Sequence, residues 1–282
     1  MRINHNISSY NAQRQLTINN TAQGKSLEKL SSGFRINRAA DDAAGLAISE
    51  KMRNQIRGLE QASQNSLDGI SLIQTAEGAL NETHAMLQRM AELYVKGANE
   101  VLTTTDAAKI DSEVKQLSEQ IGSIATQTQF NTKKLLDGTV TTISFQVGAN
   151  AGETIGLSLQ SATATALNVL FGAVGSGLSA LSNAGAELNS SAAANLSVVQ
   201  AAINTVSEIR SNLGAVQNRL EHTINNLGTT AENLQAAESR IRDVDMAKEM
   251  SEFTKNGILQ QAAQAMLAQA NQQPQGVLQL LR

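Results

Sequence analysis

Apolar residues recur every three or four positions along two long stretches of the chain. The more regular stretch contains Leu196, Val199, Ile203, Val206, Ile209, Leu213, Val216, Leu220, Ile224 and Leu227. The other begins after Asp41-Asp42 and contains Met52, Ile56, Leu59, Leu67, Ile70, Ile73, Leu80, Leu87 and Tyr94. This spacing places the apolar side chains on one face of a helix, close to the coiled-coil period. The pattern therefore predicts two long helices with packing faces.

The middle of the chain has a different pattern. Apolar and polar side chains alternate over residues 143–147 and again over 155–159, and a segment with two glycines separates them. A period of two is typical of strands with one buried face. We therefore expect a β-hairpin near 141–160. The following segment, 161–192, is rich in Ala, Ser and Gly and is expected to form a short variable surface loop.

The order of these segments predicts a mainly α fold. A shorter helical pattern follows Thr105-Asp106, and the single proline, Pro274, lies close to the end of the chain. We expect residues 42–160 and 193–242 to form an elongated antiparallel bundle of long helices, with the small β-hairpin region attached. The chain runs out through helices, turns at the hairpin and returns, so both termini are expected at one end.

The composition of the 282 residues excludes several classes of protein. Without cysteine, the chain forms no disulfides, no thiolate metal site and no cysteine nucleophile. A net charge of −3 gives no general attraction to nucleic acid or to an anionic membrane. No apolar run is long enough to span a bilayer, and the first residues lack the pattern of a cleaved secretory signal. We expect no membrane insertion and no nucleic-acid partner.

The polar residues do not indicate an active site. The three histidines, His5, His84 and His222, are far apart and lie outside metal-binding motifs. Asp41 and Asp42 resemble a carboxylate pair for acid–base chemistry, but neighbours on a helix point about 100° apart. Capping of a helix start is the better interpretation. We expect no enzymatic activity, no metal and no cofactor.

The two ends of the chain, 1–41 and 243–282, place large apolar side chains among small and polar ones. These apolar positions are Ile3, Ile7, Leu16, Leu27, Leu30, Phe34, Met250, Phe253, Ile258, Leu259, Met266, Leu267, Leu278 and Leu281. A single helix gains too little from propensity to offset the cost of ordering it. We therefore expect these ends to be disordered alone and to fold when copies pack together. The alternative is that the two ends pack against each other within one molecule.

Several long sequence blocks resemble those of bacterial flagellins. They are 27–49 (LEKLSSGFRINRAADDAAGLAIS), 52–59, 68–80, 237–247 (AESRIRDVDMA) and 277–282. The resemblance covers residues 1–160 and 190–282. It implies a short form of the family, because the segment between these parts is too short for a large outer domain.

The resemblance implies a non-enzymatic subunit that self-assembles into the flagellar filament for swimming motility. The implied partners are further copies of the chain, the flagellar export apparatus, a secretion chaperone and the filament cap. The implied location is extracellular, reached without a cleaved signal peptide. The terminal helices would form the inner core of the filament, and the middle helices and hairpin would surround it.

The resemblance also implies recognition of the monomer by the Toll-like receptor that senses flagellin. The family's contact motif, Q-R-x-x-E-L, matches residues 88–93, and an acidic contact aligns with a residue of the next helix. The implied receptor contacts are Gln88, Arg89, Glu92, Leu93 and Glu113.

Two other functions are consistent with the pattern. A minor filament or hook–filament junction protein of the same superfamily has the same layout of helices. A soluble coiled-coil signalling scaffold has a similar composition, but it is expected to turn at a helical tip and not at a β-hairpin.

Overall fold

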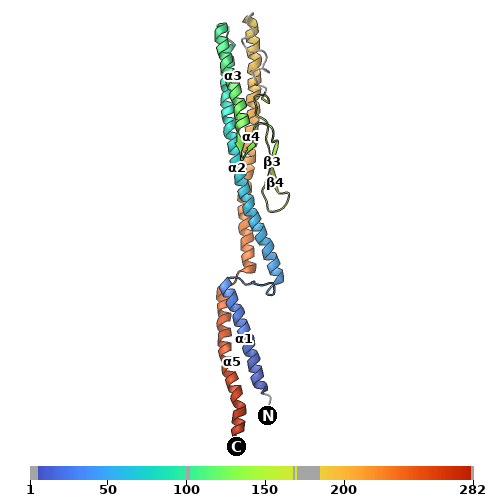
Figure 1. Ribbon diagram of the computed structural model, residues 1–282, viewed down its shortest axis with the longest axis vertical. Coiled ribbons are helices and arrows are strands. Elements are labelled where there is room, and N and C mark those ends of the chain that lie inside the picture. The colour runs from blue at the N-terminus through green and yellow to red at the C-terminus, as the bar shows by residue number, and fades with distance from the viewer. Residues whose placement is uncertain (1–5, 100–101, 168, 170–184, 281–282) are drawn as a thin grey trace. The chain divides into compact units, whose positions relative to one another are not determined.

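The computed structural model describes residues 6–99, 102–167, 169 and 185–280, with side chains apart from those of 104, 185–193 and 273–280 (Figure 1). The described residues are mainly helical, and two small antiparallel strand pairs lie between α3 and α4 in the sequence, which confirms the predicted fold class. The chain divides into two compact units. One contains residues 1–56 and 232–282, and the other contains residues 57–231.

Three helices form the larger unit: α2 (Ala43–Gly97), α3 (Thr104–Gln127) and α4 (Gly185–Arg242), of which α2 and α4 also extend into the other unit (Figure 1). Helix α3 runs antiparallel to α2, because Arg89 contacts Glu113 and Tyr94 faces Asp111. Helix α4 is also antiparallel to α2. Its Arg210 pairs with Glu77, whereas its later residue Leu227 lies near the earlier Leu59.

The core of this unit contains the apolar faces that the sequence predicts. The large apolar side chains of these helices that are no more than 1% exposed include Ile73, Leu80, Leu87 and Met90 of α2, Ile121 of α3, and Val199, Val206, Leu213 and Leu220 of α4. They belong to one continuous cluster that also includes residues of the β-hairpin. Burial of such side chains contributes about 1.5–3 kcal/mol each, so this cluster provides the main stabilisation of the unit.

One predicted core residue is wrong, because Leu67 is 53% exposed. The inward positions along this part of α2 are occupied by the small residues Ala62, Ser66 and Gly69. A Cβ atom at Gly69 would lie 3.3 Å from side-chain atoms of both Leu220 and Phe145. Small residues are therefore needed where α4 and the hairpin approach α2 closely. The prediction considered only large apolar side chains and so did not identify these small residues as core positions.

The predicted β-hairpin is confirmed. Strands β3 (Thr142–Gln146) and β4 (Thr154–Ser158) pair antiparallel, with Ile143 opposite Leu157 and Phe145 opposite Ile155. The hairpin packs on α2, where the Asn65 side-chain amide donates to the Gln146 carbonyl at 3.1 Å. At the hairpin turn, Ala149 lies so close to Gly58 that a Cβ atom there would be 2.8 Å from the Ala149 Cβ.

A second, shorter hairpin was not expected from the sequence. Strands β1 (Gln129–Phe130) and β2 (Lys133–Lys134) pair after the end of α3. The two residues of the turn, Asn131 and Thr132, have positive φ angles of 48° and 67°. Two residues in the left-handed conformation match the twist of a two-residue hairpin. Thr is uncommon in that conformation, and the turn lacks the Asn-Gly or Asp-Gly pair by which such hairpins are usually recognised in a sequence.

The segment predicted as a surface loop, 161–192, differs from the prediction at both ends. Near its start, Ala162, Ala164, Leu167 and Val169 are buried in the core cluster, and Ser118 of α3 donates a hydrogen bond of 2.8 Å to the Val169 carbonyl. Near its end, α4 already begins at Gly185. Small Ala side chains fit between packed helices, so an Ala-rich composition was a poor guide to exposure. Residues 168 and 170–184 lie outside the described part of the chain.

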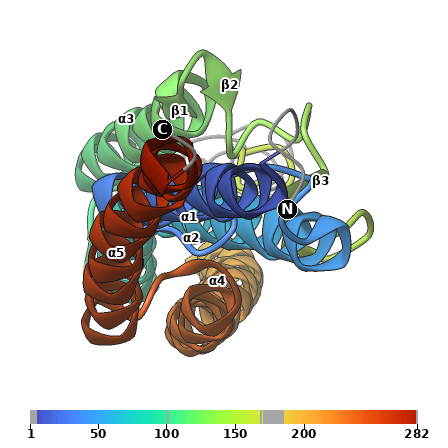
Figure 2. The same ribbon diagram turned by 90° about the horizontal axis from the view of Figure 1, so that it is seen from below.

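Two antiparallel helices, α1 (Ile7–Ser32) and α5 (Met246–Leu280), form most of the smaller unit (Figure 2). The Asn6 side-chain amide donates to the Ala270 carbonyl at 2.7 Å at one end of the pair. Lys29 lies 3.9 Å from Glu249 at the other end. The two ends of the chain therefore pack against each other in this structure, as in the alternative considered above.

The unit that contains the chain ends extends beyond the predicted terminal segments 1–41 and 243–282, because it comprises residues 1–56 and 232–282. The first turns of α2 and the last turns of α4 belong with the terminal helices and not with the larger unit. Arg53 of α2 pairs with Glu238 of α4 at 2.9 Å, and Arg242 pairs with Glu50 at 2.9 Å. These two ion pairs connect the first turns of α2 with the last turns of α4, which both belong to the smaller unit. The boundary between the two units therefore lies within α2 and α4, after residues 56 and 231.

Candidate interaction surfaces

The contact between α1 and α5 is made mainly by small and polar groups. Among the described side chains of the two helices, Ser26, Glu249 and Ala270 are buried, and the large apolar side chains Leu16, Leu30, Phe253 and Leu267 are half-buried. Near the chain ends, the Ser9 hydroxyl donates to the Asn271 side-chain oxygen at 2.8 Å. An interface without fully buried large apolar side chains stabilises the helix pair less than the core stabilises the larger unit.

The large apolar side chains of these helices lie mostly on the outside of the pair. Those between 41% and 70% exposed are Ile7, Tyr10, Ile18 and Leu27 of α1 and Met246, Met250, Ile258, Leu259 and Met266 of α5. Single exposed apolar residues are common on proteins, but a dense set on two paired helices marks an interaction surface. We call these nine residues the outer apolar set.

Most of the predicted packing residues can now be placed. Ile7, Leu27, Met250, Ile258, Leu259 and Met266 belong to the outer apolar set, whereas Leu16, Leu30, Phe34, Phe253 and Leu267 are half-buried. Ile3, Leu278 and Leu281 lie outside the residues whose side chains the structure describes. Tyr10, Ile18 and Met246 were not among the predicted packing residues, although their helical positions beside other apolar residues would have indicated them.

The outer apolar set occupies several sides of α5. With about 100° between successive residues, Met246 and Met250 flank one edge of the face that contacts α1. Leu259 and Met266 flank the opposite edge, and Ile258 points away from α1. A helix with apolar groups on three sides requires more than one neighbour to bury them.

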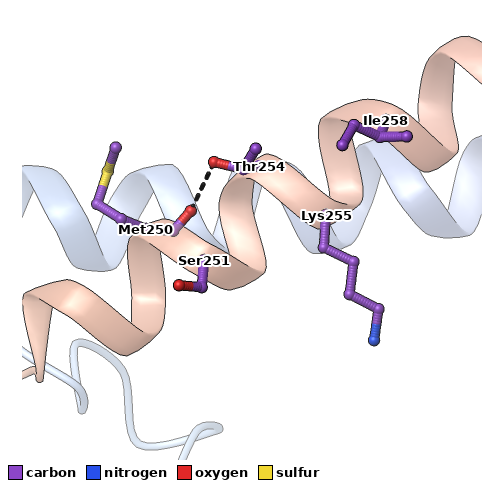
Figure 3. A pocket seen from close by; sticks show the side chains of 5 residues that line it. All are labelled: Met250, Ser251, Thr254, Lys255 and Ile258. Carbon is purple, nitrogen blue, oxygen red and sulfur yellow. Dashed lines mark hydrogen bonds between the residues drawn. The ribbon is translucent and has the colours of Figure 1, made fainter.

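One part of this surface is hollowed. Met250, Thr254 and Ile258 lie along one side of α5, with Ser251 and Lys255 beside them, around a shallow open hollow of about 460 Å³ (Figure 3). The Thr254 hydroxyl donates to the Met250 carbonyl at 2.9 Å, so it is already satisfied within the helix. The hollow therefore has mainly an apolar character and is suited to an apolar side chain of a partner.

Two of the distinctive sequence blocks meet where α4 ends and α5 begins. The Arg35 N–H donates to the Arg242 carbonyl at 2.7 Å, and the Val244 N–H donates to the Gly33 carbonyl at 3.0 Å. The Arg242 guanidinium also lies 4.8 Å from the centre of the Phe34 ring. These contacts and the ion pair of Arg242 with Glu50 connect the sequence blocks 27–49 and 237–247, and we call this region the joint.

The paired carboxylates Asp41 and Asp42 have separate structural roles in this joint, as the capping interpretation predicted. Asp42 accepts a hydrogen bond from the Gly45 N–H at 2.8 Å and caps α2. Asp41 accepts from the N–H groups of Arg38 and Asn37 in the preceding turn. These bonds, that from Arg38 foremost, lower the pKa of the Asp41 carboxyl.

The predicted receptor contacts lie in the larger unit, where α2 and α3 are paired. Arg89 is half exposed and forms ion pairs with Glu113 at 3.0 Å and Glu92 at 3.1 Å. Hydrogen bonding to Glu113 and then to Glu92 raises the pKa of the Arg89 guanidinium, which stays fully charged. Three of the predicted residues therefore form one exposed polar cluster on two helices.

The other two predicted contacts differ from each other. Gln88 is exposed and lies 3.0 Å from the His84 ring nitrogen Nε2. Leu93 is only 3% exposed and belongs to the core cluster, because it faces into the helix bundle. Its side chain therefore supports the polar cluster from beneath and is not available to a partner in this structure.

The described residues contain no group of three side chains of the kinds that bind metal ions. Within the same residues, no helix has both the length and the apolar character needed to cross a membrane. His84 and His222 lie on different helices, and neither is part of a carboxylate cluster. The candidate interaction surfaces of the described residues are therefore the outer apolar set and the polar cluster of Arg89, Glu92 and Glu113.

Comparisons with known proteins identify the family. The bacterial flagellin N-terminal helical region matches residues 3–141, and the C-terminal helical region matches residues 196–281. The chain belongs to the bacterial flagellin family. Flagellins are structural proteins and not enzymes, in agreement with surfaces that suit packing better than catalysis.

Individual relatives support this assignment. The chain is 58% identical to a flagellin of Halalkalibacterium halodurans and 48% identical to a flagellar filament 33 kDa core protein of Treponema phagedenis, each over the full length of both chains. A putative flagellar hook-associated protein from Vibrio parahaemolyticus shares the fold, with a TM-score of 0.58 over 72% of this chain and all of that chain at 16% identity.

Proposed function

We propose that this chain is the subunit of a bacterial flagellar filament and self-assembles by packing its terminal helices against those of neighbouring copies. The observation that carries the proposal is the outer apolar set, which places large apolar side chains on the outside of α1 and α5. Contacts that repeat head to tail without closing generate a helical fibre. Such a fibre also provides the several neighbours that α5 needs to bury its apolar sides.

The energetics of the terminal helices favour folding that is coupled to assembly. The buried contact between α1 and α5 consists of Ser26, Glu249 and Ala270 with few large apolar groups, so the pair is expected to be weakly ordered in a free monomer. Each side chain of the outer apolar set that becomes buried contributes about 1.5–3 kcal/mol. These contributions offset part of the cost of ordering the two helices, and the backbone hydrogen bonds and further contacts of the assembled state add to them.

The place of the protein in the cell follows from this proposal. The filament lies outside the cell and drives swimming, and the chain reaches it through the flagellar export apparatus with a secretion chaperone and the filament cap as further partners. The terminal helices form the inner core of the filament. Helices α2 to α4 and the β-hairpin form the layer around it.

A filament subunit is a better interpretation than a hook–filament junction protein. The chain is 58% identical to the flagellin of Halalkalibacterium halodurans in an alignment that covers both chains fully. Its identity to the hook-associated protein is only 16%. Signalling scaffolds are disfavoured because both helical regions of the flagellin family match this chain.

Seeded polymerisation of the purified chain tests the proposal. We expect short filament seeds to grow into fibres visible by electron microscopy. Ile258→Ser should raise the critical concentration by about 10- to 100-fold, because about 1.4 kcal/mol corresponds to a factor of ten. Gln261→Ser, on the same helix and also exposed, is the matched control and should polymerise normally. Normal assembly of the Ile258 variant would contradict a role for this surface.

We further propose that the free monomer is a ligand of the Toll-like receptor that senses flagellin. The cluster of Arg89, Glu92 and Glu113 supplies exposed groups of both charges, and Gln88 lies beside it. Removing an exposed ion pair costs at most about 1 kcal/mol, so variants at these positions should stay folded. Leu93 is unsuitable for this test because its truncation would disturb the core.

Cells that express this receptor provide the measurement. Arg89→Ala and Glu113→Gln should weaken activation by the purified monomer by about tenfold or more, the loss expected for a charged contact. Arg219→Ala, at an exposed position of α4, is the control. Unchanged activation by both cluster variants, with an unchanged melting temperature, would reject the receptor contact and leave the filament proposal intact.

A further inference from the structure

The methionines among the described residues differ in exposure, and Met52 and Met86 of α2 are half-buried. All three methionines of α5, Met246, Met250 and Met266, are exposed by 50%, 49% and 64%. Met90 of α2 is fully buried in the core. The exposed thioethers are therefore concentrated on one helix, and this helix carries the surface that we assign to assembly.

The surroundings of Met250 show how closely its thioether is connected with that surface. The side chain forms one wall of the hollow on α5, together with Ile258 and Thr254 (Figure 3). Because the Thr254 hydroxyl is bonded to the Met250 carbonyl, the hollow offers a thioether no polar partner from that side chain. The Ser251 hydroxyl is likewise bonded within the helix, to the Ala247 carbonyl at 2.9 Å, and Lys255 extends away from Met250 (Figure 3). A sulfoxide at Met250 is therefore placed beside the apolar side chain of Ile258 when a neighbour covers the hollow.

We propose that the exposed methionines of α5 are oxidation sites, and that their conversion to sulfoxides by a peroxide blocks polymerisation of the chain. This inference rests on the proposed filament function. The sulfur lone pair attacks one oxygen of the peroxide, the O–O bond breaks, and a sulfur–oxygen bond forms. The sulfur is oxidised by two electrons, the peroxide is reduced, and with hydrogen peroxide the other oxygen leaves as water.

The effect on assembly follows from the chemistry of the product. A sulfoxide is polar and chiral, whereas the thioether that it replaces is apolar and flexible. Burying it against apolar groups without a hydrogen-bond partner is unfavourable. Assembly itself covers the thioethers, so the unpolymerised chain is sensitive to peroxide and the polymer is protected. Methionine sulfoxide reductases reverse the change.

Mapping the sites by mass spectrometry is the first part of the test. Unpolymerised chain and polymer are treated with hydrogen peroxide, and each methionine-containing peptide is measured for an added oxygen atom. We expect Met246, Met250 and Met266 to be oxidised in the free chain, with Met90 unmodified as the internal control. The three sites should be oxidised at least about tenfold more slowly in the polymer. Oxidation of Met90 at the same rate as Met250 would overturn the proposal.

Polymerisation of the treated chain is the second part. Oxidised chain should have a critical concentration raised by about tenfold or more, corresponding to the burial of unpaired polar groups. Treatment with methionine sulfoxide reductases should restore it. The triple variant with Met246→Leu, Met250→Leu and Met266→Leu keeps apolar side chains of similar volume and should polymerise equally well with and without peroxide.

The outcomes separate this inference from the function on which it rests. If untreated chain fails to extend seeds, the filament proposal fails. If untreated chain extends seeds and oxidised chain does so equally well, only the methionine proposal is overturned. It is also overturned if the leucine variant remains sensitive to peroxide, because the inhibition then arises elsewhere.

Discussion

At the scale of single residues, size and solvation determine the structure more than the apolar pattern alone indicates. The spacing of large apolar residues correctly located core positions such as Ile73 and Leu213. It placed Leu67 inside, although Gly69 and Ser66 take the inward positions there. The pattern failed at these positions because close approach of helix and hairpin requires small residues, which are not recognised by their hydrophobicity.

Gly58 is a position where this requirement can be tested. A Cβ atom at Gly58 would lie 2.8 Å from the Ala149 Cβ, so Gly58→Ala must displace the hairpin turn. We expect a loss of about 1–3 kcal/mol in the free energy of unfolding by urea. Gly78→Ala, at a position of α2 with no atom within 4 Å of the added Cβ, should instead stabilise by about 0.5–1 kcal/mol. Equal stability of the two variants would contradict the packing described.

Tyr94 provides a prediction for alkaline pH. Burial, and secondarily the charge of Asp111, raises the pKa of Tyr94 to about 12. The unfolded chain loses this proton near pH 10 and the folded chain does not, so stability is complete below about pH 10 and falls as the pH rises toward 12. The expected loss is about 2–3 kcal/mol.

Urea unfolding of the chain at several alkaline pH values measures this loss. Tyr94→Phe cannot ionise, so its stability should decline less than that of the unchanged chain between pH 10 and pH 12. The unrelated, exposed Tyr10 gives the control variant Tyr10→Phe, which should keep the original dependence. Parallel curves for Tyr94→Phe and the unchanged chain would show that Tyr94 is not the group responsible.

At the scale of the elements, the sequence predicted the long helices and the β3–β4 hairpin well, because each has a strong period over many residues. The β1–β2 hairpin was missed because it has only two residues in each strand and a Thr in its turn. The joint between Gly33 and Val244 was visible only as two unusual sequence blocks. A contact between segments more than 200 residues apart cannot be inferred from local periodicity.

The joint is expected to depend on the stacking of Phe34 and Arg242. Phe34→Ala removes the aromatic face 4.8 Å from the guanidinium, an interaction of about 0.5–1 kcal/mol. We expect limited proteolysis within residues 33–42 and 243–245 to be about two- to fivefold faster in this variant. Phe34→Tyr keeps the ring and should be cut at the original rate. Equal cleavage of the Ala and Tyr variants would show that the stacking does not hold the joint.

At the scale of the whole molecule, the two compact units differ in how they are stabilised. The larger unit has one continuous core that includes α2, α3, α4 and the hairpin. The pair of α1 and α5 has few buried apolar groups and exposes the outer apolar set. Which surface of this pair meets another copy was beyond sequence reasoning. The composition of the ends, by contrast, was enough to propose them as sites of assembly.

Hydrogen–deuterium exchange before and after polymerisation tests the central claim most directly. We expect the backbone amides of α1 and α5 to exchange rapidly in the free chain and to become protected in the polymer. Amides near Leu80 and Leu213, in the core of the larger unit, should be protected in both states. If α1 and α5 are already protected in the free chain to the level of that core, and polymerisation does not change them, neighbouring copies do not complete the terminal helices.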